Sequence, residues 1–300
     1  EIISQPLKVT FVDEAGVDAQ GVSREAYTAF WQSFFETSAD GEYYRIPSLN
    51  PHYGLEEWQA IGRILAKGLR DHDVFPLQMA PAFFQALVFG EESISPEDLT
   101  DSFLRFLSDV DSAAVRAALA GHLSDDEKEI FEDLLDREGS HTIPEDDQVL
   151  PVIRQLAHKC VIQNSSYALQ AMGGIVRDAL ANSFPSVQSI KNLYDRCKPT
   201  PKKVCDLFVA NPMTKEQSQS LRYLMQFVRA QDDEGLGKLL RYMTSSCIMS
   251  VKSITIEFRD MSGIARRPIA HTCGPVLELP STYASYREFR SEWQSVLSSG

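Results

Sequence analysis

The sequence predicts a mainly helical α+β fold in two parts, a large helical region followed by a small region that also contains strands. Much of the chain before residue 211 carries apolar side chains at helical spacing, whereas a stretch near the C-terminus alternates apolar and polar residues. Asn211-Pro212 separates the two regions, because the residue before a proline is disfavoured in a helix. With 300 residues, 43% of them hydrophobic, the chain is long enough for about two domains.

The clearest strand pattern lies near the C-terminus. Within the first predicted strand, Val251–Asp260, the apolar residues Ile254, Ile256 and Phe258 alternate with polar ones, as in a strand with one buried face. A second strand is predicted at Gly274–Pro280. Apolar residues spaced three and four apart then predict a closing helix that packs on these strands: Tyr283, Tyr286, Phe289, Trp293, Val296 and Leu297.

Cys273 lies between the two predicted strands. Gly274-Pro275 follows it directly and should end any strand, which would leave the sulfur on a loop rim where another protein can reach it. The alternative is a small buried hydrophobic residue, the usual role of a free cysteine. Arg266, Arg267 and His271 could favour the reactive thiolate, but for His271 we favour a structural role in holding the loop.

These residues resemble a known family. His271-Thr272-Cys273, with the Leu-Glu-Leu-Pro and Tyr-Ala-Ser-Tyr-x-x-Phe stretches after it, resembles the C-terminal lobe of HECT-type ubiquitin ligases, whose catalytic cysteine ends a His/Asn-Thr-Cys triplet. Three further resemblances occur in family order along the chain: Lys8–Phe11 with Glu14–Glu25, Ile61–Leu69 with Phe75-Pro76-Leu77, and Leu239–Thr244. Among HECT ligases, the resemblance is nearest to the G2/M phase-specific subgroup.

The resemblance implies a two-lobed architecture, with a large helical N-lobe in residues 1–211, a hinge near 209–214, and a small α+β C-lobe in residues 212–300. It implies that Cys273 accepts ubiquitin as a glycyl thioester, with His271 and Thr272 supporting the loop, and passes it to a substrate lysine. The implied partners are ubiquitin, a ubiquitin-conjugating enzyme and a protein substrate, with no cofactor and no metal.

The net charge of −13 is concentrated in the first part of the chain. Residues 213–300 contain 11 Lys and Arg against 9 Asp and Glu, whereas Ser124–Asp147 alone contains 11 acidic and two basic residues. Such a segment repels nucleic acid and anionic membranes but attracts a basic protein. Ser124 and Glu127 predict a capping box for an acidic helix there. We expect the conjugating enzyme to dock within about residues 95–150, on four apolar residues that this helix exposes: Ile130, Phe131, Leu134 and Leu135.

Cysteine usage and the absence of long apolar runs limit the class of protein. Five cysteines without paired short spacing argue for a reducing compartment, hence the cytoplasm or nucleus, and against a disulfide framework or zinc module. The six histidines lack metal-ligand spacing. No apolar run approaches the roughly 20 residues that span a bilayer. Glu1 in place of a methionine suggests a fragment of a longer protein.

Helix ends are predicted from capping residues. Ser23 should cap a helix with a strongly aromatic face, with Arg24 and Glu25 forming an ion pair at its start or contacting the small lobe; we favour the ion pair. Other predicted features are a strand at Leu7–Val12, close helix packing at Gly62 and Gly68, helix starts at Pro81, Ser95 and Thr214, and a helix break near Gly173-Gly174.

Two alternative functions remain open. The first is a catalytically degenerate HECT-like module that binds partners without chemistry. Two departures from the family favour it: a shortened docking region, and a C-terminus at Gly300 without a tail phenylalanine. A further departure is Gly274 in place of an aromatic or Asn-paired residue after the cysteine. The second is a cysteine hydrolase that pairs Cys273 with a distant histidine.

Overall fold

The computed structural model describes residues 5, 9, 21–140, 142–263 and 266–298, and within them the chain is mainly helical with a small sheet. The helices are α1 (Gly21–Ser38), α2 (Leu55–His72), α3 (Pro81–Phe89), η2 (Glu91–Ser93), α4 (Pro96–Phe106), α5 (Asp109–Ala120), α6 (Asp125–Arg137), α7 (Val149–His158), η3 (Lys159–Gln163), α8 (Ser166–Leu180), α9 (Val187–Cys197), α10 (Pro201–Asp206), α11 (Lys215–Arg229), α12 (Asp233–Thr244) and α13 (Tyr286–Ser298). The strands are β1 (Ala39–Asp40), β2 (Ile46–Pro47), β3 (Phe208–Ala210), β4 (Ile254–Arg259), β5 (Ile269–His271) and β6 (Val276–Pro280). The strand predicted at Leu7–Val12 lies outside the described residues. None of the helices in the described ranges combines the length and the apolar character needed to cross a bilayer.

The chain divides into two compact units. Unit 1 combines the described residues up to Phe30 with 67–75 and with the chain from Asp195 onward, whereas unit 2 comprises residues 31–66 and 76–194. Residues from both ends of the sequence therefore contribute to unit 1. The lobe boundary expected at residue 211 stays a prediction, and strand β3, which precedes it, pairs with β4 of the C-terminal sheet.

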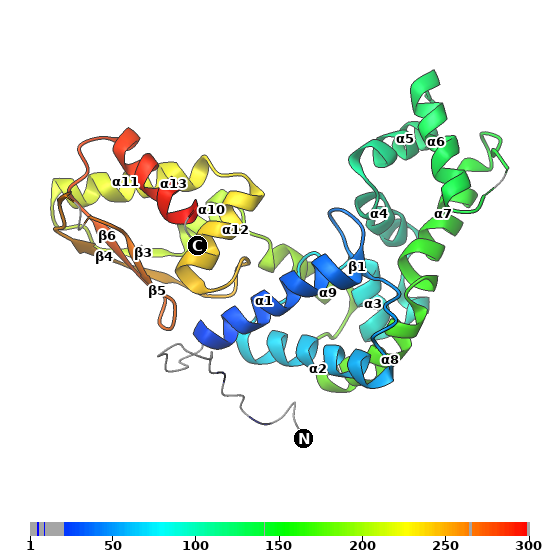
Figure 1. Cartoon of the computed structure of the whole chain (residues 1–300), viewed down its shortest axis with the longest axis horizontal. Coiled ribbons are helices and arrows are strands. Elements are labelled where there is room, and N and C mark those ends of the chain that lie inside the picture. The colour runs from blue at the N-terminus through cyan, green and yellow to red at the C-terminus, as the bar shows by residue number, and fades with distance from the viewer. Residues whose placement is uncertain (1–4, 6–8, 10–20, 141, 264–265, 299–300) are drawn as a thin grey trace. The chain divides into compact units, whose positions relative to one another are not determined.

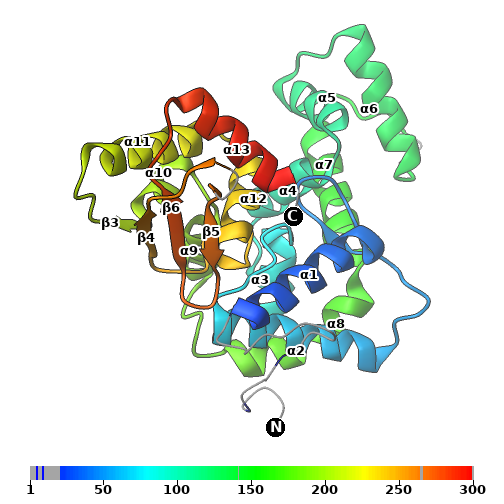
Figure 2. The same ribbon diagram turned by 60° about the vertical axis from the view of Figure 1, so that its left-hand side comes forward.

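Unit 1 is built on a four-stranded sheet in the order β3-β4-β6-β5, in which only β5 runs antiparallel to its neighbour. Helices α11 and α13 lie over one face of this sheet (Figures 1 and 2). Ile254 and Ile256 are buried at alternate positions of β4, as the period-two pattern predicted. The second predicted strand begins at Val276 rather than Gly274, because Gly274-Pro275 lies in a turn.

The closing helix α13 supplies much of the core of unit 1. Phe289 and Trp293, four residues apart on one helix face, are both fully buried and stack at 6.0 Å between ring centroids. Tyr283 packs against Phe289 at 4.8 Å, although it precedes the helix instead of lying on it. The predicted packing of this aromatic face on the sheet is confirmed.

Unit 2 is a helical assembly in which α3 packs on α8, α4 on α7, and α5 on α6. The predicted aromatic face of α1 is buried there through Trp31, Phe34 and Phe35. A Cβ atom placed at Gly62 of α2 would lie 3.3 Å from the backbone of Met172, so α2 and α8 approach closely at this glycine. The close packing inferred from the cost of glycine in a helix is confirmed.

Four predicted helix starts are confirmed. Helix α3 begins at Pro81, and the other three starts are fixed by local hydrogen bonds. The Ser95 and Thr214 hydroxyls accept from the amides of residues three further along, at 3.1 and 3.2 Å. Ser124 and Glu127 form the predicted capping box of α6.

Two predicted helix boundaries are wrong. Helix α1 begins at Gly21, so Ser23 lies inside its first turn and is buried. Helix α8 continues through Gly173 and Gly174, and the break falls earlier, after the π-helical turn η3. Helix α3 packs on α8, and a Cβ atom placed at Gly173 would make only ordinary contacts, the nearest with the side chain of Arg177 at 3.4 Å.

Candidate functional site

Cys273 lies on the four-residue turn that joins β5 to β6. His271 pairs with Val276 across this hairpin, so residues 272–275 project beyond the last paired positions. The Cys273 side chain is exposed, and among the described residues, apart from the chain neighbours of Gly274, no atom lies within 4 Å of the position that a Cβ on Gly274 would occupy. The prediction of an accessible thiol is confirmed; its chemical role stays a prediction at this point.

His271 contacts a carboxylate on the neighbouring strand. Its Nε2 lies 3.0 Å from Oε1 of Glu278, and Arg259 forms an ion pair with the same carboxylate at 3.1 Å. The guanidinium of Arg259, and then the imidazole of His271, hold the pKa of Glu278 below its usual value. This contact agrees with the structural role favoured for His271, in which the side chain braces the hairpin that carries the cysteine.

Arg266 takes part in a separate network. Its guanidinium binds Glu288 at 2.6 Å and Glu292 at 3.0 Å, and it lies over the ring of Tyr283 at 4.7 Å. Burial raises the pKa of Tyr283, and its hydrogen bond to Glu292 raises it further. Arg266 thus anchors the segment before the hairpin to α13, and this network gives no support to the expectation that Arg266 favours a Cys273 thiolate.

The first turns of α1 contact the loop that carries Cys273, next to the hairpin turn in Figure 1. Arg24 donates from Nη2 to the carbonyl of Thr272 at 2.5 Å and from Nε to the carbonyl of Thr244 at 2.9 Å. Glu25 forms an ion pair with Arg241 on α12. The ion pair favoured for Arg24 and Glu25 with each other is replaced by contacts between α1 and the C-terminal segments, the other alternative that the sequence left open.

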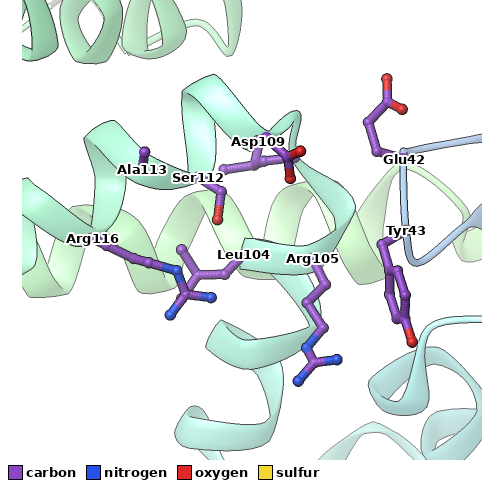
Figure 3. Close-up of a pocket in the computed structure, with 9 residues that line it drawn as sticks. Glu42, Tyr43, Leu104, Arg105, Asp109, Ser112, Ala113 and Arg116 are labelled. Carbon is purple, nitrogen blue, oxygen red and sulfur yellow. The ribbon is translucent and has the colours of Figure 1, made fainter. Parts of the chain in front are cut away.

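A pocket in unit 2 has a volume of about 670 Å³; we call it the α4–α5 pocket. In Figure 3, Arg105 of α4 lies between Arg116 of α5 and Tyr43, while Glu42 and Tyr43 extend in opposite directions from the segment between β1 and β2. The guanidinium of Arg105 lies 5.5 Å from the ring centroid of Tyr43. The remaining lining residues are Leu104, Leu107, Asp109, Ser112 and Ala113.

Comparison with known proteins bears on the chemistry of these sites. The pattern of the HECT-domain (ubiquitin-transferase) family matches residues 21–299. This chain belongs to the HECT-domain family. It is 22% identical, over 334 aligned positions, to the probable E3 ubiquitin-protein ligase TOM1 of Eremothecium gossypii. The alignment covers 98% of this HECT domain and 10% of the fungal relative, so the chain spans about a tenth of that relative's length.

The apolar residues that the sequence assigned to partner docking are not a surface of this HECT domain. Phe131, Leu134 and Leu135 are 2%, 0% and 1% exposed, and Ile130 is half-buried. Their face of α6 packs on α5, whose Ala114, Val115 and Ala118 are buried. The predicted exposure of Phe131, Leu134 and Leu135 is therefore wrong, because a stripe at helical spacing has one apolar face and α5 covers it.

The other cysteines of the HECT domain differ from Cys273 in accessibility. Cys160, Cys197 and Cys205 are buried and Cys247 is partly buried. Burial, followed by the charge of Glu138, raises the pKa of the Cys160 thiol to about 12. Burial likewise raises the pKa of Cys197 to about 11. In the described residues, no group of three His, Cys, Asp or Glu side chains gathers as metal ligands.

These differences predict selective labelling. At about pH 9, only roughly one Cys160 thiol in a thousand is ionised, and it is also shielded from reagent. Brief treatment of the folded chain with iodoacetamide is expected to modify Cys273 first and to leave Cys160 and Cys197 unmodified. Peptide mass spectrometry after timed quenching measures the order. Denatured protein, in which all five cysteines should react, provides the control, and early labelling of Cys160 in the folded chain contradicts the prediction.

Proposed function

We propose that this chain is the catalytic domain of a ubiquitin ligase that carries ubiquitin as a thioester on Cys273 and transfers it to lysine. The observation that carries the proposal is an exposed thiol on a hairpin turn, at the last residue of a His-Thr-Cys triplet, in a member of the HECT-domain family. On motif resemblance alone, we also assign the chain to the G2/M phase-specific subgroup.

The proposed reaction has two acyl transfers. In the first, the Cys273 thiolate attacks the carbonyl carbon of the ubiquitin thioester on the conjugating enzyme; a new S–C bond forms, the old one breaks, and the enzyme's sulfur leaves as a thiolate. In the second, a substrate lysine amine attacks the Cys273 thioester. A C–N bond forms as the C–S bond breaks, the amine loses a proton to solvent, and Cys273 leaves as a thiolate. Exchange between thioesters is nearly isoenergetic, so positioning dominates the catalytic requirement.

The test is the covalent intermediate itself. The chain is incubated with a conjugating enzyme charged with ubiquitin, and the products are separated with and without reducing agent. A ubiquitin adduct on the chain that reducing agent removes is the expected result. If no adduct forms but the charged enzyme binds, the degenerate binding module is the better description. Hydrolysis of ubiquitin esters without transfer would instead indicate a cysteine hydrolase.

We place conjugating-enzyme docking at the α4–α5 pocket, whose α4 and α5 residues lie within the segment 95–150 expected from the sequence, whereas Glu42 and Tyr43 lie outside it. Its composition supports this assignment, because arginine and tyrosine are enriched among the residues that dominate protein–protein binding. Tyr43 is 45% exposed, and both Arg105 and Arg116 line the pocket. Leu104 and Leu107 provide apolar surface beside these polar groups.

Replacing Arg105 with alanine is expected to raise the KM for the charged conjugating enzyme by roughly tenfold, because a partner would lose an anchor and Tyr43 would lose its stacked neighbour. The kcat should change little, since the thiol lies in the other unit. Initial rates of adduct formation over a range of enzyme concentrations give both constants. Arg154→Ala on α7, which removes an arginine outside the pocket lining together with its ion pair to Glu97, is the matched control. Equal KM values in the Arg105→Ala and Arg154→Ala variants would contradict the proposal that the α4–α5 pocket binds the conjugating enzyme.

A further inference from the structure

The start of α1 is tied to two segments that lie far along the chain: the end of α12, and the turn of the hairpin that carries the cysteine. Arg24 reaches Thr244, 220 residues away, and Thr272, 248 residues away. The Thr28 hydroxyl donates to the carbonyl of Ser245 at 3.1 Å. All of these residues belong to unit 1, so the first turns of α1 are part of the body that presents the thiol.

The Arg24 side chain is 4% exposed, and its two hydrogen bonds act on different backbone groups. Thr244 is the last residue of α12, where helix carbonyls lack intrahelical partners and carry partial negative charge. The guanidinium therefore caps α12 while it holds the carbonyl of the peptide that links Thr272 to Cys273. Hydrogen bonds from a charged donor are stronger than neutral ones, and the planar guanidinium fixes the direction of both.

Two further contacts restrict the same loop. A Cβ placed on Gly21 would lie 2.8 Å from Oγ1 of Thr272 and 3.0 Å from the amide nitrogen of Cys273, so the first turn of α1 packs directly on this backbone. The ion pair between Glu25 and Arg241 holds α12 against α1, and the carboxylate raises the pKa of Arg241.

We propose that Arg24 is a positioning residue, which fixes the Thr272–Cys273 peptide against α1 and α12 and thereby sets the direction of the Cys273 thiol for acyl transfer. The proposal rests on the function proposed above and adds a residue far from the His-Thr-Cys triplet in sequence. It also explains why residue 21 is a glycine, because a larger side chain there would push the Thr272–Cys273 loop away from Arg24.

The first experiment separates positioning from docking and from folding. Arg24→Ala is expected to lower kcat for adduct formation by roughly 10- to 100-fold, since small misplacements of a reacting group have effects of this size, with KM for the charged conjugating enzyme within about twofold of wild type. Arg24→Lys should recover part of the loss, because one ammonium can reach one of the two carbonyls. Arg222→Ala, which removes an exposed arginine of α11 in the same unit, is the control. Unchanged kcat in Arg24→Ala overturns the proposal.

A second variant covers the case in which Arg24→Ala unfolds. Gly21→Ala keeps the arginine and suits a helix better than glycine, yet its Cβ displaces the loop. The expected result is a kcat loss of roughly tenfold with an unchanged unfolding midpoint in urea. Wild-type kcat in this variant contradicts the proposal.

Alkylation of Cys273 distinguishes failure of this proposal from failure of the proposed function, because it requires no ubiquitin. Release of the loop from α1 uncovers one side of the Cys273 backbone, so iodoacetamide should modify Cys273 about threefold faster in Gly21→Ala and Arg24→Ala than in wild type. Equal rates in all three proteins overturn the positioning role. A wild type that never forms an adduct, combined with faster alkylation in the variants, instead overturns the ligase function and leaves the loop contact intact.

Discussion

Replacing Cys273 with alanine is expected to abolish the ubiquitin adduct that reducing agent removes, with a loss of transfer on the order of a thousandfold or more. The reason is chemical: the acyl group must reside on a nucleophile between the conjugating enzyme and lysine, and alanine supplies none. Timed mixing with charged conjugating enzyme, followed by electrophoresis with and without reducing agent, measures the effect.

Serine at the same position sharpens this prediction. Cys273→Ser keeps a nucleophilic oxygen of similar size, so any adduct should form more slowly and, being an oxygen ester, should survive reducing agent. Cys247→Ala removes the most accessible of the other four cysteines, one that lies in the same unit as Cys273, and should leave adduct formation unchanged. Persistence of a thiol-sensitive adduct in Cys273→Ala would place the intermediate on another residue.

Replacing Phe131 with alanine is expected to lower the free energy of unfolding by about 3–5 kcal/mol, the range for deleting a buried aromatic side chain. Phe131 is 2% exposed on the face of α6 that packs on α5, so its removal leaves a cavity and not a changed surface. Urea denaturation followed by circular dichroism gives the difference. At temperatures where the variant stays folded, its KM for the charged conjugating enzyme should match that of wild type.

The control for Phe131→Ala lies on the same helix. Lys128 of α6 has a side chain that is 60% exposed and forms only a long surface ion pair with Glu132, so Lys128→Ala should change the unfolding free energy by no more than about 0.5 kcal/mol. A Phe131→Ala protein as stable as wild type, with a raised KM, would restore the docking role that the sequence suggested.

The features that the sequence predicted correctly depend on short-range chemistry. Caps at Ser95, Ser124 and Thr214 need only the next few residues, and the strand pattern around Ile256 needs only one buried face of a sheet. The exposure of Cys273 followed in the same way from the Gly-Pro turn beside it. Each of these features is determined by a short stretch of neighbouring residues.

The features that the sequence missed depend on distant partners. An apolar stripe on α6 is equally compatible with a binding surface and with an internal contact, and only the position of α5 decides between them. Gly173 and Gly174 resembled a helix break, yet α8 continues through both, and α3 packs on this helix. The contact of Arg24 with Thr272 spans 248 residues, so no local pattern could select it over an ion pair with Glu25. The only local signal for this contact is the charged pair Arg24 and Glu25 near the start of a helix.

The composition of unit 1 from both ends of the sequence has a consequence for biosynthesis. On the ribosome, the residues that Arg24, Glu25 and Thr28 bind emerge more than two hundred residues after them. These three side chains therefore remain solvated while the intervening helices of unit 2 are synthesised. Unit 2 can therefore fold first during translation, as N-terminal parts of a nascent chain generally do. A nascent chain released before residue 241 would leave Arg24, Glu25 and Thr28 without these acceptors, and quality-control proteases would encounter first turns of α1 without their C-terminal contacts, although Trp31, Phe34 and Phe35 of the same helix belong to unit 2.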